Sequence, residues 1–600
     1  MSFFHFDTFS REFGQAVKSR THLIRRTFLG VILLVHVGML IRSAWIHSPT
    51  FQEVSVLPAG VYHWTTGDFS HFRVNPPLVR LLAALPVLAM HPNVDWHQVQ
   101  DHFWLRNEVE VGADFVRANG ESAAWMFFVA RCICIPFSIL GALVCYFWSK
   151  SLFGTASGVS ALLMWCFCPN VLGHAGLVSG DAQTAAVAVL VCYVFRGWLH
   201  ERTWSHSGLL GIALGLAITT KSTLLVFIPM AMLIWCADRV WNRCEICRPQ
   251  LRGDVKQLLL AAAMSYWMLL AIYGFQNCFV RLGEYQFVSR ALAGSSVDQR
   301  DIYWSNRFRD GGLGGLPVPF PEDFLLGIDR QKRDFEITTP SYAWGRWRTG
   351  GCWWYYLLGL ATKTTLGTLT LFAAAVFGLW RRPPPWMLAD WLTLFLPPLA
   401  ILALVSAQTG LNDHFRYVFP VLPFLFIIAS GGMLPVANRE RLSVSLTGSA
   451  LLIASVTASI NNFPNSIAYF NLAARLACQD SPILLGSSVD WGQDLYLIKE
   501  FYDAKIAPER LLYAHVSGYD PNDLGLSCEP IGFGHGWSSK LASELREDRT
   551  PRWVAISVNR LFDDTGQFAS LRQVKPDYMI GSTTMMFRLD ERDKGISDGL

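Results

Sequence analysis

Long apolar runs recur along this chain, and each is close to the roughly 20 residues that an α-helix needs to cross a bilayer. The length of 600 residues would also suit several soluble domains. However, hydrophobic residues make up 52% of the chain and charged residues only 16%. The sequence therefore predicts a mainly α-helical, multi-pass membrane protein with about eleven transmembrane helices. The net charge of +4 is too small to indicate nucleic acid as a partner.

The distribution of basic residues predicts the orientation of these spans, because lysine and arginine gather on the cytoplasmic side. The segment before the first run is rich in basic residues, which places the N-terminus in the cytoplasm. No small-residue cleavage site follows that run, so we expect it to be retained as a span. Every short loop that this orientation puts inside is also basic, and the C-terminus then lies outside. The predicted spans lie near 27–45, 125–148, 153–169, 182–198, 206–220, 222–237, 257–277, 354–380, 388–407, 416–433 and 445–461.

The same assignment predicts three parts of the chain. Residues 1–26 form a cytoplasmic segment, and residues 27–461 form a transmembrane domain with long outer loops at 46–124 and 278–353. Residues 462–600 form a small extracytoplasmic α/β domain, because strand-like and helix-like runs alternate there. The strand-like runs are Ile483–Leu485, Leu511–Val516 and Trp553–Val558, and the helix-like runs are Leu495–Tyr502 and Leu541–Arg546. In the first outer loop, Leu78–Met90 and Asp95–Glu121 are predicted as helices on the membrane surface.

The cysteines indicate little chemistry. Most of the 13 lie in predicted spans, where they act as small apolar residues. Cys244 and Cys247 form one C-x-x-C motif, which lacks the other two ligands of a structural zinc site. Two pairs outside the predicted membrane could form disulfides, and the sequence leaves both pairings open: Cys278 with Cys352, and Cys478 with Cys528.

The stretch from Thr50 to Arg80 directly follows the first span and is unusually rich in charged and aromatic residues. Its Asn75-Pro76-Pro77 corner forces a turn, because proline fixes its own φ and disfavours helix in the residue before it. A charged loop pressed against a membrane suits chemistry on a lipid head group. It is also what an ordinary connecting loop with interfacial aromatics looks like, so this stretch alone leaves both interpretations open.

Polar residues that interrupt the later apolar runs fall on the predicted outer side. Ionisable residues at membrane depth are costly and usually mark a site, although a single lysine or arginine is also explained by snorkelling to the interface. Their accumulation on one face predicts a site there. These residues are His174, Asp181, Lys221, Lys363, Asp413, His414 and Arg416.

Carboxylates and cations at a membrane surface suit a phosphate-bearing lipid as substrate. Cations would hold the phosphate as a leaving group, and a carboxylate would take a proton from the attacking hydroxyl or amine. We predict Arg73, Lys221, Lys363 and Arg416 as phosphate-binding residues, Glu53, Asp68 and Asp181 as catalytic candidates, and His174, Tyr62, Trp64 and Tyr356 as substrate-binding residues. The aromatic residues equally fit an interfacial belt. The sequence has no Gly-rich nucleotide loop, so neither ATP nor a soluble nucleotide-sugar is indicated.

Several motifs occur in a characteristic order along nearly the whole chain. They include Gln52-Glu53, Leu57-Pro58-Ala59-Gly60, Gly67-Asp68, Asn75-Pro76-Pro77-Leu78, Arg416-Tyr417 and the run Asp490-Trp491-Gly492-Gln493-Asp494. In this order and spacing the chain resembles the GT-C fold glycosyltransferases that use a polyprenyl-phosphate sugar donor. This is the superfamily of the protein O-mannosyltransferases and aminoarabinose transferases.

The resemblance implies an inverting transferase in which an aspartate of the first loop is the general base and the lipid phosphate leaves. This sequence departs from the family at that position. The usual Asp-Glu pair reads Gln52-Glu53, and an amide does not accept a proton at neutral pH. Three interpretations follow: Glu53 is the base, which we favour; Asp68 or Asp181 takes over; or the protein is a catalytically weakened relative that binds lipid without transfer.

The sequence thus predicts a transferase that moves a sugar from a polyprenyl-phosphate carrier to a lipid, glycan or protein acceptor on the outer face of the cell membrane. No tight His/Asp cluster demands a divalent metal, and Asp181 with His174 would be the pair to hold one. The competing interpretations are a transporter or flippase for a lipid-linked sugar, and a non-catalytic scaffold, which the Gln52 substitution keeps open. We expect the run from Asp490 to Asp494 to anchor the last domain rather than to catalyse.

Overall fold

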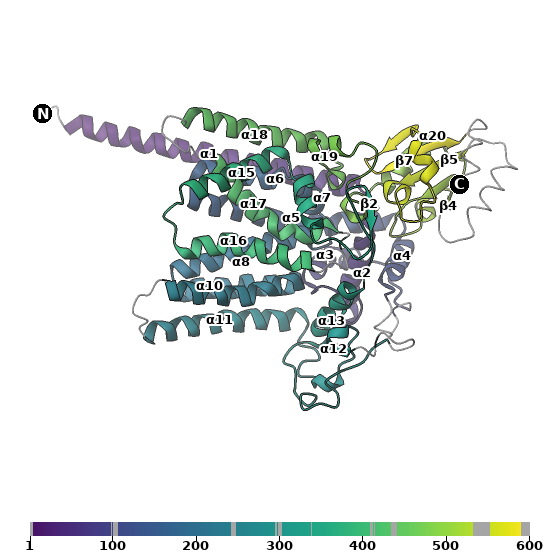
Figure 1. The fold of residues 1–600 in the computed structure, drawn as a ribbon, viewed down its shortest axis with the longest axis horizontal. Coiled ribbons are helices and arrows are strands. Elements are labelled where there is room, and N and C mark those ends of the chain that lie inside the picture. The colour runs from purple at the N-terminus through teal and green to yellow at the C-terminus, as the bar shows by residue number, and fades with distance from the viewer. Residues whose placement is uncertain are drawn as a thin grey trace.

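The computed structural model describes residues 4–97, 99, 106–241, 248–294, 297, 303–337, 339–407, 412, 414–433, 441–531 and 552–589. Most of these residues form a bundle of roughly parallel helices, and a β-sheet lies beyond one end of that bundle (Figure 1). We call this end of the bundle the sheet end. The N-terminal part of the first helix projects from the opposite end (Figure 1). The predicted C-x-x-C motif and the predicted helix Leu541–Arg546 lie outside the described residues.

The bundle contains helices on all eleven of the predicted spans. They are α1 (Phe4–Ile46), α5 (Ser122–Phe153), α6 (Thr155–Cys166), α8 (Asp181–His200), α9 (Trp204–Thr220), α10 (Phe227–Trp241), α11 (Arg248–Ile272), α14 (Tyr355–Lys363), α15 (Leu366–Arg381), α16 (Leu388–Ala407), α17 (Leu422–Ser430) and α18 (Arg441–Asn462).

By length and composition, fewer of these helices qualify as membrane spans than the sequence predicts. Within the described residues, 6 helices are long and apolar enough to cross a bilayer. A seventh candidate is the pair α14 and α15, which is bent by 112° at its break. Helices such as Thr155–Cys166 are apolar but shorter. The mainly helical, multi-pass architecture is confirmed, and the full set of eleven spans stays a prediction.

Close helix packing explains how the bundle buries its centre. Helices α9 and α11 approach each other at Gly211 and Gly215, where an added Cβ would come within 2.8 Å of Met264 and 2.4 Å of Met268, respectively. In a membrane no hydrophobic effect drives helices together, so they associate through close packing. Small residues at a crossing let the two backbones approach closely. Large side chains are also fully buried in the bundle, among them Trp148, Trp165 and Trp198.

Short helices cover the sheet end of the bundle (Figure 1). Helix α2 (Phe51–Thr66) follows α1 after a short corner and packs against α3 (Leu78–Leu88) and α4 (Glu108–Asn119). The helix predicted at Leu78–Met90 is confirmed as α3, whereas the one predicted at Asp95–Glu121 is realised only as α4. The remaining helices of this end are α7 (Pro169–His174), α12 (Arg290–Ala293), α13 (Glu322–Glu336) and α19 (Leu472–Ala477), and a short hairpin joins β1 (Ser341–Ala343) to β2 (Arg346–Arg348).

The C-terminal segment forms a five-stranded sheet with the order β4-β3-β5-β7-β6. Strand β3 runs parallel to β4 and β5, while β7 runs antiparallel to β5 and β6. Apolar residues of α20, such as Ile498 and Tyr502, share a buried cluster with Leu511 of β3. The elements are α20 (Leu495–Lys505), β3 (Leu511–Ala514), β4 (Cys528–Pro530), β5 (Arg552–Ser557), α22 (Val558–Leu561), β6 (Tyr578–Ile580) and β7 (Thr584–Leu589).

The element predictions for this segment are mostly confirmed. The strand-like runs at 511–516 and 553–558 correspond to β3 and β5, and the helix-like run at 495–502 corresponds to α20. The strand predicted at Ile483–Leu485 is wrong, because Leu484 forms only an isolated bridge with Ala343. The folding of residues 462–600 as a separate domain stays a prediction. Cys278, Cys352, Cys478 and Cys528, whose pairing the sequence left open, are free thiols in this structure.

Candidate active site

A cavity of about 490 Å³ opens at the sheet end, between α2, α8, α13 and the 3₁₀ segment η5 (Phe415–Val421). Its polar lining brings together residues that are far apart in the sequence: Gln52, Asp181, Lys221, Arg416, Tyr417 and Trp491. A second group on its wall consists of Arg106, Glu108 and Asp334, in which Arg106 bonds to Asp334 at 2.9 Å. The cavity therefore lies where the long loops at 46–124 and 278–353 meet the ends of the bundle helices.

Asp181 lies at the centre of the cavity's charged group. It is the first residue of α8, and Gly180 before it takes φ +79°, a conformation that favours glycine. Lys221 Nζ donates a hydrogen bond of 2.5 Å to Asp181 Oδ1, and Arg416 Nε lies 3.4 Å from Asp181 Oδ2. Lys221 is presented by the break between α9 and the 3₁₀ segment η1 (Ser222–Val226). Two cations thus face one carboxylate, so these three side chains together carry one positive charge, which suits an anionic ligand beside them.

Several buried polar atoms on the cavity wall have no hydrogen-bond partner in the described part of the chain. They are Gln52 Oε1, Asn75 Oδ1, Asp181 Oδ2 and Arg416 Nη1. Buried polar groups are nearly always hydrogen-bonded, because leaving one unpaired costs about 1–3 kcal/mol. Since these atoms share one cavity, a polar ligand bound there would supply the missing partners.

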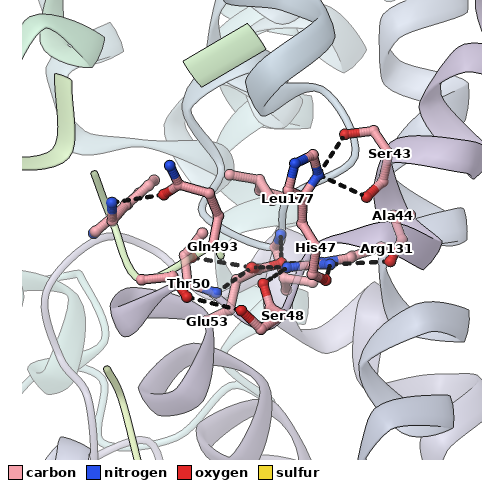
Figure 2. A network of polar contacts seen from close by, with 12 residues as sticks. Ser43, Ala44, His47, Ser48, Thr50, Glu53, Arg131, Leu177 and Gln493 are labelled. Atoms are coloured by element: carbon pink, nitrogen blue, oxygen red, sulfur yellow. Dashed lines mark hydrogen bonds and ion pairs between the residues drawn. The ribbon is translucent and has the colours of Figure 1, made fainter. Parts of the chain in front are cut away.

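Glu53 lies in a different and closed environment, which Figure 2 shows from close by. Its side chain is 0% exposed. Oε1 accepts hydrogen bonds from Arg131 Nε (2.9 Å) and from Val178 N (3.1 Å). Oε2 accepts from Arg131 Nη2 (2.6 Å) and from the backbone N (2.9 Å) and Oγ1 (3.0 Å) of Thr50. Burial alone would raise the pKa of Glu53, but the Arg131 charge and these donors hold that pKa below its ordinary value.

The remaining donors of Arg131 tie this network to the corner between α1 and α2. Its guanidinium also donates to the carbonyl oxygens of Ala44, His47 and Ser48 (Figure 2). The pair of Glu53 and Arg131 therefore joins the end of α1, the start of α2, α5 and the loop before Asp181. Glu53 does not line the cavity, whereas its neighbour Gln52 does. Successive residues of an α-helix point about 100° apart, and in α2 this rotation directs Gln52 to the cavity and Glu53 to Arg131.

Asp68 forms a local turn after α2. Its Oδ2 accepts hydrogen bonds from Tyr62 (2.7 Å) and Ser70 Oγ (2.6 Å), and its Oδ1 accepts one from Ser70 N (2.8 Å). Burial acts to raise the pKa of Asp68, but the Ser70 and Tyr62 donors lower it overall. Trp64 donates from its indole nitrogen to the carbonyl of Leu81 at 2.9 Å. Asp68, Tyr62 and Trp64 are not among the residues that line this cavity.

The other predicted site residues are also held away from the cavity. Arg73 Nε bonds to Asp323 of α13 at 2.6 Å. Lys363 is 1% exposed, and its Nζ donates to the carbonyl oxygens of Ile467 and Ser488. Tyr356 is buried against Tyr355. His174 is buried beside Phe419, and this burial lowers its pKa to about 4, so the ring is neutral near pH 7.

Of the predicted site residues, the structure therefore brings Asp181, Lys221, His414 and Arg416 together in this cavity. Sequence reasoning missed Trp491 and Tyr417 as wall residues, although both belong to the motifs noted above. It noted Gln52 only as a departure from the family. Asp413 lies outside the described residues. Among the described residues, no three His, Cys, Asp or Glu side chains gather where they would hold a metal ion.

Residues 123–272 match the family model of the dolichyl-phosphate-mannose-protein mannosyltransferases. This segment runs from α5 to the end of α11 and contains Asp181 and Lys221. The resemblance to the GT-C glycosyltransferases is confirmed. The matched segment supplies two of the three residues in the charged group around Asp181, namely Asp181 itself and Lys221.

Solved structures of two GT-C glycosyltransferases are similar to this chain at low identity. ArnT from Cupriavidus metallidurans bound to undecaprenyl phosphate is 14% identical, with a TM-score of 0.45 over 93% of this chain and 98% of that chain. Its apo form is 13% identical, with a TM-score of 0.45 over 94% of this chain and 98% of that chain. The Archaeoglobus fulgidus oligosaccharyltransferase is 11% identical, with a TM-score of 0.43 over 91% of this chain and 71% of that chain. No curated protein sequence matches the chain.

Proposed function

We propose that this protein transfers a sugar from a polyprenyl-phosphate carrier to an acceptor on the outer face of the membrane. In this proposal the cavity around Asp181 is the active site. One observation carries the proposal: two buried cations, Lys221 and Arg416, converge on Asp181 at a cavity with unpaired polar atoms. The family match over the segment that contains Asp181 and Lys221 supports the same reaction class.

The two cations are assigned to the donor phosphate. A sugar phosphodiester carries one negative charge, and cleavage of the bond between the sugar carbon and the phosphate oxygen leaves a further electron pair on the phosphate. Lys221 and Arg416 would stabilise that growing charge, because charge-assisted hydrogen bonds strengthen as the acceptor becomes more negative. Arg416 Nη1 has no partner in the described chain and is free to bind phosphate.

Asp181 is assigned as the general base. The acceptor oxygen or nitrogen forms a bond to the anomeric carbon from the face opposite the phosphate, and its proton moves to Asp181. Oδ1 is held by Lys221, whereas Oδ2 accepts no hydrogen bond and lies at the cavity wall. Gln52, at the position where the family carries its base, would hydrogen-bond the acceptor without taking its proton.

Glu53 and Asp68, the other catalytic candidates, receive different roles in this proposal. The Glu53 oxygens already accept five hydrogen bonds, so accepting a substrate proton would require the network to break. Asp68 is engaged by Tyr62 and Ser70 and does not line this cavity. We therefore assign Glu53 to positioning the loop before Asp181, through its bond from Val178 N.

The proposal includes the membrane topology predicted from the sequence. The sheet end lies outside, the N-terminus lies in the cytoplasm, and residues 462–600 form an extracytoplasmic α/β domain. The basic inner loops support this orientation. The cavity at the sheet end would then open where a lipid carrier presents its phosphate.

The experiment uses full-length protein in nanodiscs with a panel of polyprenyl-phosphate sugars, and it measures release of the polyprenyl phosphate. We expect turnover by the wild type and its loss in D181N, with binding of farnesyl phosphate retained. D503N is the matched control, because Asp503 is an exposed aspartate of α20 that pairs only with Lys499 among the described residues. Farnesyl phosphate that binds equally to the wild type and to a K221M/R416A double variant would contradict the proposed phosphate site.

A further inference from the structure

The C-terminal segment contributes Trp491 to the wall of the cavity, and no other residue beyond 462 lines it in the described part of the chain. The sequence predicts only an anchoring role for the run from Asp490 to Asp494. The structure places the indole of Trp491 directly against a cation of the proposed phosphate site. The centre of the Arg416 guanidinium lies 4.0 Å from the centroid of the Trp491 ring.

This stacking has a direct consequence for Arg416. A guanidinium that lies face-on against an aromatic ring keeps its N–H groups at its edge, where they remain available to a phosphate. One such group, Nη1, has no hydrogen-bond partner in the described chain, and Nε points toward Asp181 at 3.4 Å. Arg416 is 8% exposed, so the stacking occurs largely out of water, where it is strongest.

Trp491 is itself rigidly held, as a residue that positions another must be. Its backbone N donates a hydrogen bond of 2.7 Å to Gln493 Oε1. Its carbonyl accepts from Phe51 N at 2.8 Å. The next residue, Gly492, takes φ +86°, and an added Cβ there would lie 2.7 Å from the carbonyl oxygen of Val516.

The same turn is bonded to the corner between α1 and α2. Ser48 N donates to Gln493 O at 3.1 Å, and Ser48 Oγ donates to Gly492 O at 2.8 Å. On the other side, Asp490 accepts hydrogen bonds from Gly492 N and from Ser557 of β5. The turn therefore joins the sheet to the start of α2, next to Gln52, and fixes the indole between them.

We propose that Trp491 is a positioning residue through which the C-terminal segment completes the active site. It holds the Arg416 guanidinium edge-on to the phosphate of the lipid carrier. This inference rests on the proposed function, because it assigns Arg416 to that phosphate. One face of the indole is covered by Arg416, so this face does not stack on a sugar ring.

The test measures the dissociation constant for farnesyl phosphate with full-length protein in nanodiscs. We expect W491L to weaken binding by about tenfold, and W491F by no more than about threefold, because the phenyl ring still offers a face to the guanidinium. The matched control is W553L. Trp553 is also a buried tryptophan of the C-terminal segment near an arginine, Arg588, but it does not line the cavity. We expect W553L to change binding by less than about twofold.

A double-mutant cycle separates positioning from a structural role. If Trp491 acts through Arg416, then adding W491L to R416A weakens binding no further. Equal weakening by W491L with and without Arg416, or equal effects of W491L and W553L, would overturn the inference. Should W491L fail to fold, the same cycle with W491F decides, since its effect must vanish in R416A.

The outcomes also distinguish this inference from the proposed function. If R416A weakens farnesyl phosphate binding and W491L does not, the role of Trp491 is wrong and the phosphate site stands. If R416A leaves binding unchanged, the assignment of Arg416 to phosphate fails, and the role of Trp491 fails with it.

Discussion

Two carboxylates at the sheet end have opposite surroundings, although both face arginine and both are buried. Glu53 is enclosed by Arg131, Thr50 and Val178, and each of its oxygens accepts at least two hydrogen bonds. Asp181 has one oxygen bonded to Lys221 and a second that accepts no hydrogen bond and lies at a cavity. A carboxylate whose acceptor positions are all filled by protein holds the fold together, whereas one left incomplete is prepared for a ligand.

The same difference applies to the cations. Arg131 donates hydrogen bonds to Glu53 and to three backbone carbonyls at the corner between α1 and α2. Arg416 instead contacts Trp491 and Asp181 and keeps Nη1 without a partner in the described chain. Breaking a closed network should therefore cost stability, and changing the open group should cost activity.

The largest expected effect is that of D181N on transfer. The amide keeps the size of the side chain but accepts no proton, so we expect the rate of sugar transfer to fall by about 10²–10⁴-fold. Because Asp181 is the counter-charge of two buried cations, the apparent unfolding temperature should also fall, so the rate is expressed per folded molecule. Single-turnover kinetics with a fixed donor concentration measure the rate. A D181N protein that transfers at the wild-type rate would show that Asp181 is not the general base.

The next effect is that of R131M on stability. Removing one partner of a buried ion pair leaves the other charge uncompensated, which costs about 3–5 kcal/mol. We expect the apparent unfolding temperature to fall well below that of R117M, since Arg117 lies on the surface of α4 with its Asp114 partner. Scanning fluorimetry in one detergent compares the two variants. Equal melting of R131M and wild type would show that the Glu53 network is not structural.

A smaller effect separates two buried lysines. Lys221 reaches the cavity, whereas Lys363 donates to the carbonyls of Ile467 and Ser488. We expect K221M to weaken farnesyl phosphate binding by about tenfold or more, because a charged hydrogen bond contributes about 1.5–3 kcal/mol. K363M should leave the dissociation constant within about twofold of the wild type. If K363M weakened binding more than K221M, the phosphate site would lie at Lys363, which the sequence also predicts as a phosphate-binding residue.

The smallest effect is a pH dependence of stability at His174. Burial lowers its pKa to about 4 in the folded protein, below the unfolded value near 6.5. The unfolded state therefore binds the proton first as the pH falls, so the contribution of this group to stability is complete above pH 6.5 and is lost toward pH 4. We expect the apparent unfolding temperature to drop over this window, and to drop less in H174N. Identical pH profiles for the two proteins would contradict a buried neutral His174.

The sequence was sufficient to predict a mainly helical, multi-pass protein, because the length of an apolar run is a local signal. The same reasoning found Asp181, Lys221 and Arg416, since charged residues beside apolar runs are visible without a fold. It could not choose between Gln52 and Glu53, because that choice depends on the rotation of α2 about its axis. The side chain of Gln52 faces the cavity, and that of Glu53, one residue later, faces Arg131.

Long-range packing accounts for the other differences. Lys363 resembles Lys221 in sequence, but the bend between α14 and α15 turns it toward backbone carbonyls. Trp491 reaches the cavity only because the C-terminal segment bonds to Ser48 and Phe51, more than 400 positions earlier in the chain. No local pattern predicts a contact of that separation.

The most direct test of the account compares donor turnover by the wild type, D181N and E53Q, each normalised to folded protein. The account predicts that D181N loses at least about 100-fold while farnesyl phosphate still binds. It predicts that E53Q melts at a lower temperature but keeps turnover within about tenfold per folded molecule, since Glu53 acts only by positioning the loop. If E53Q loses turnover with its stability intact and D181N does not, then Glu53 is the base and the account is wrong.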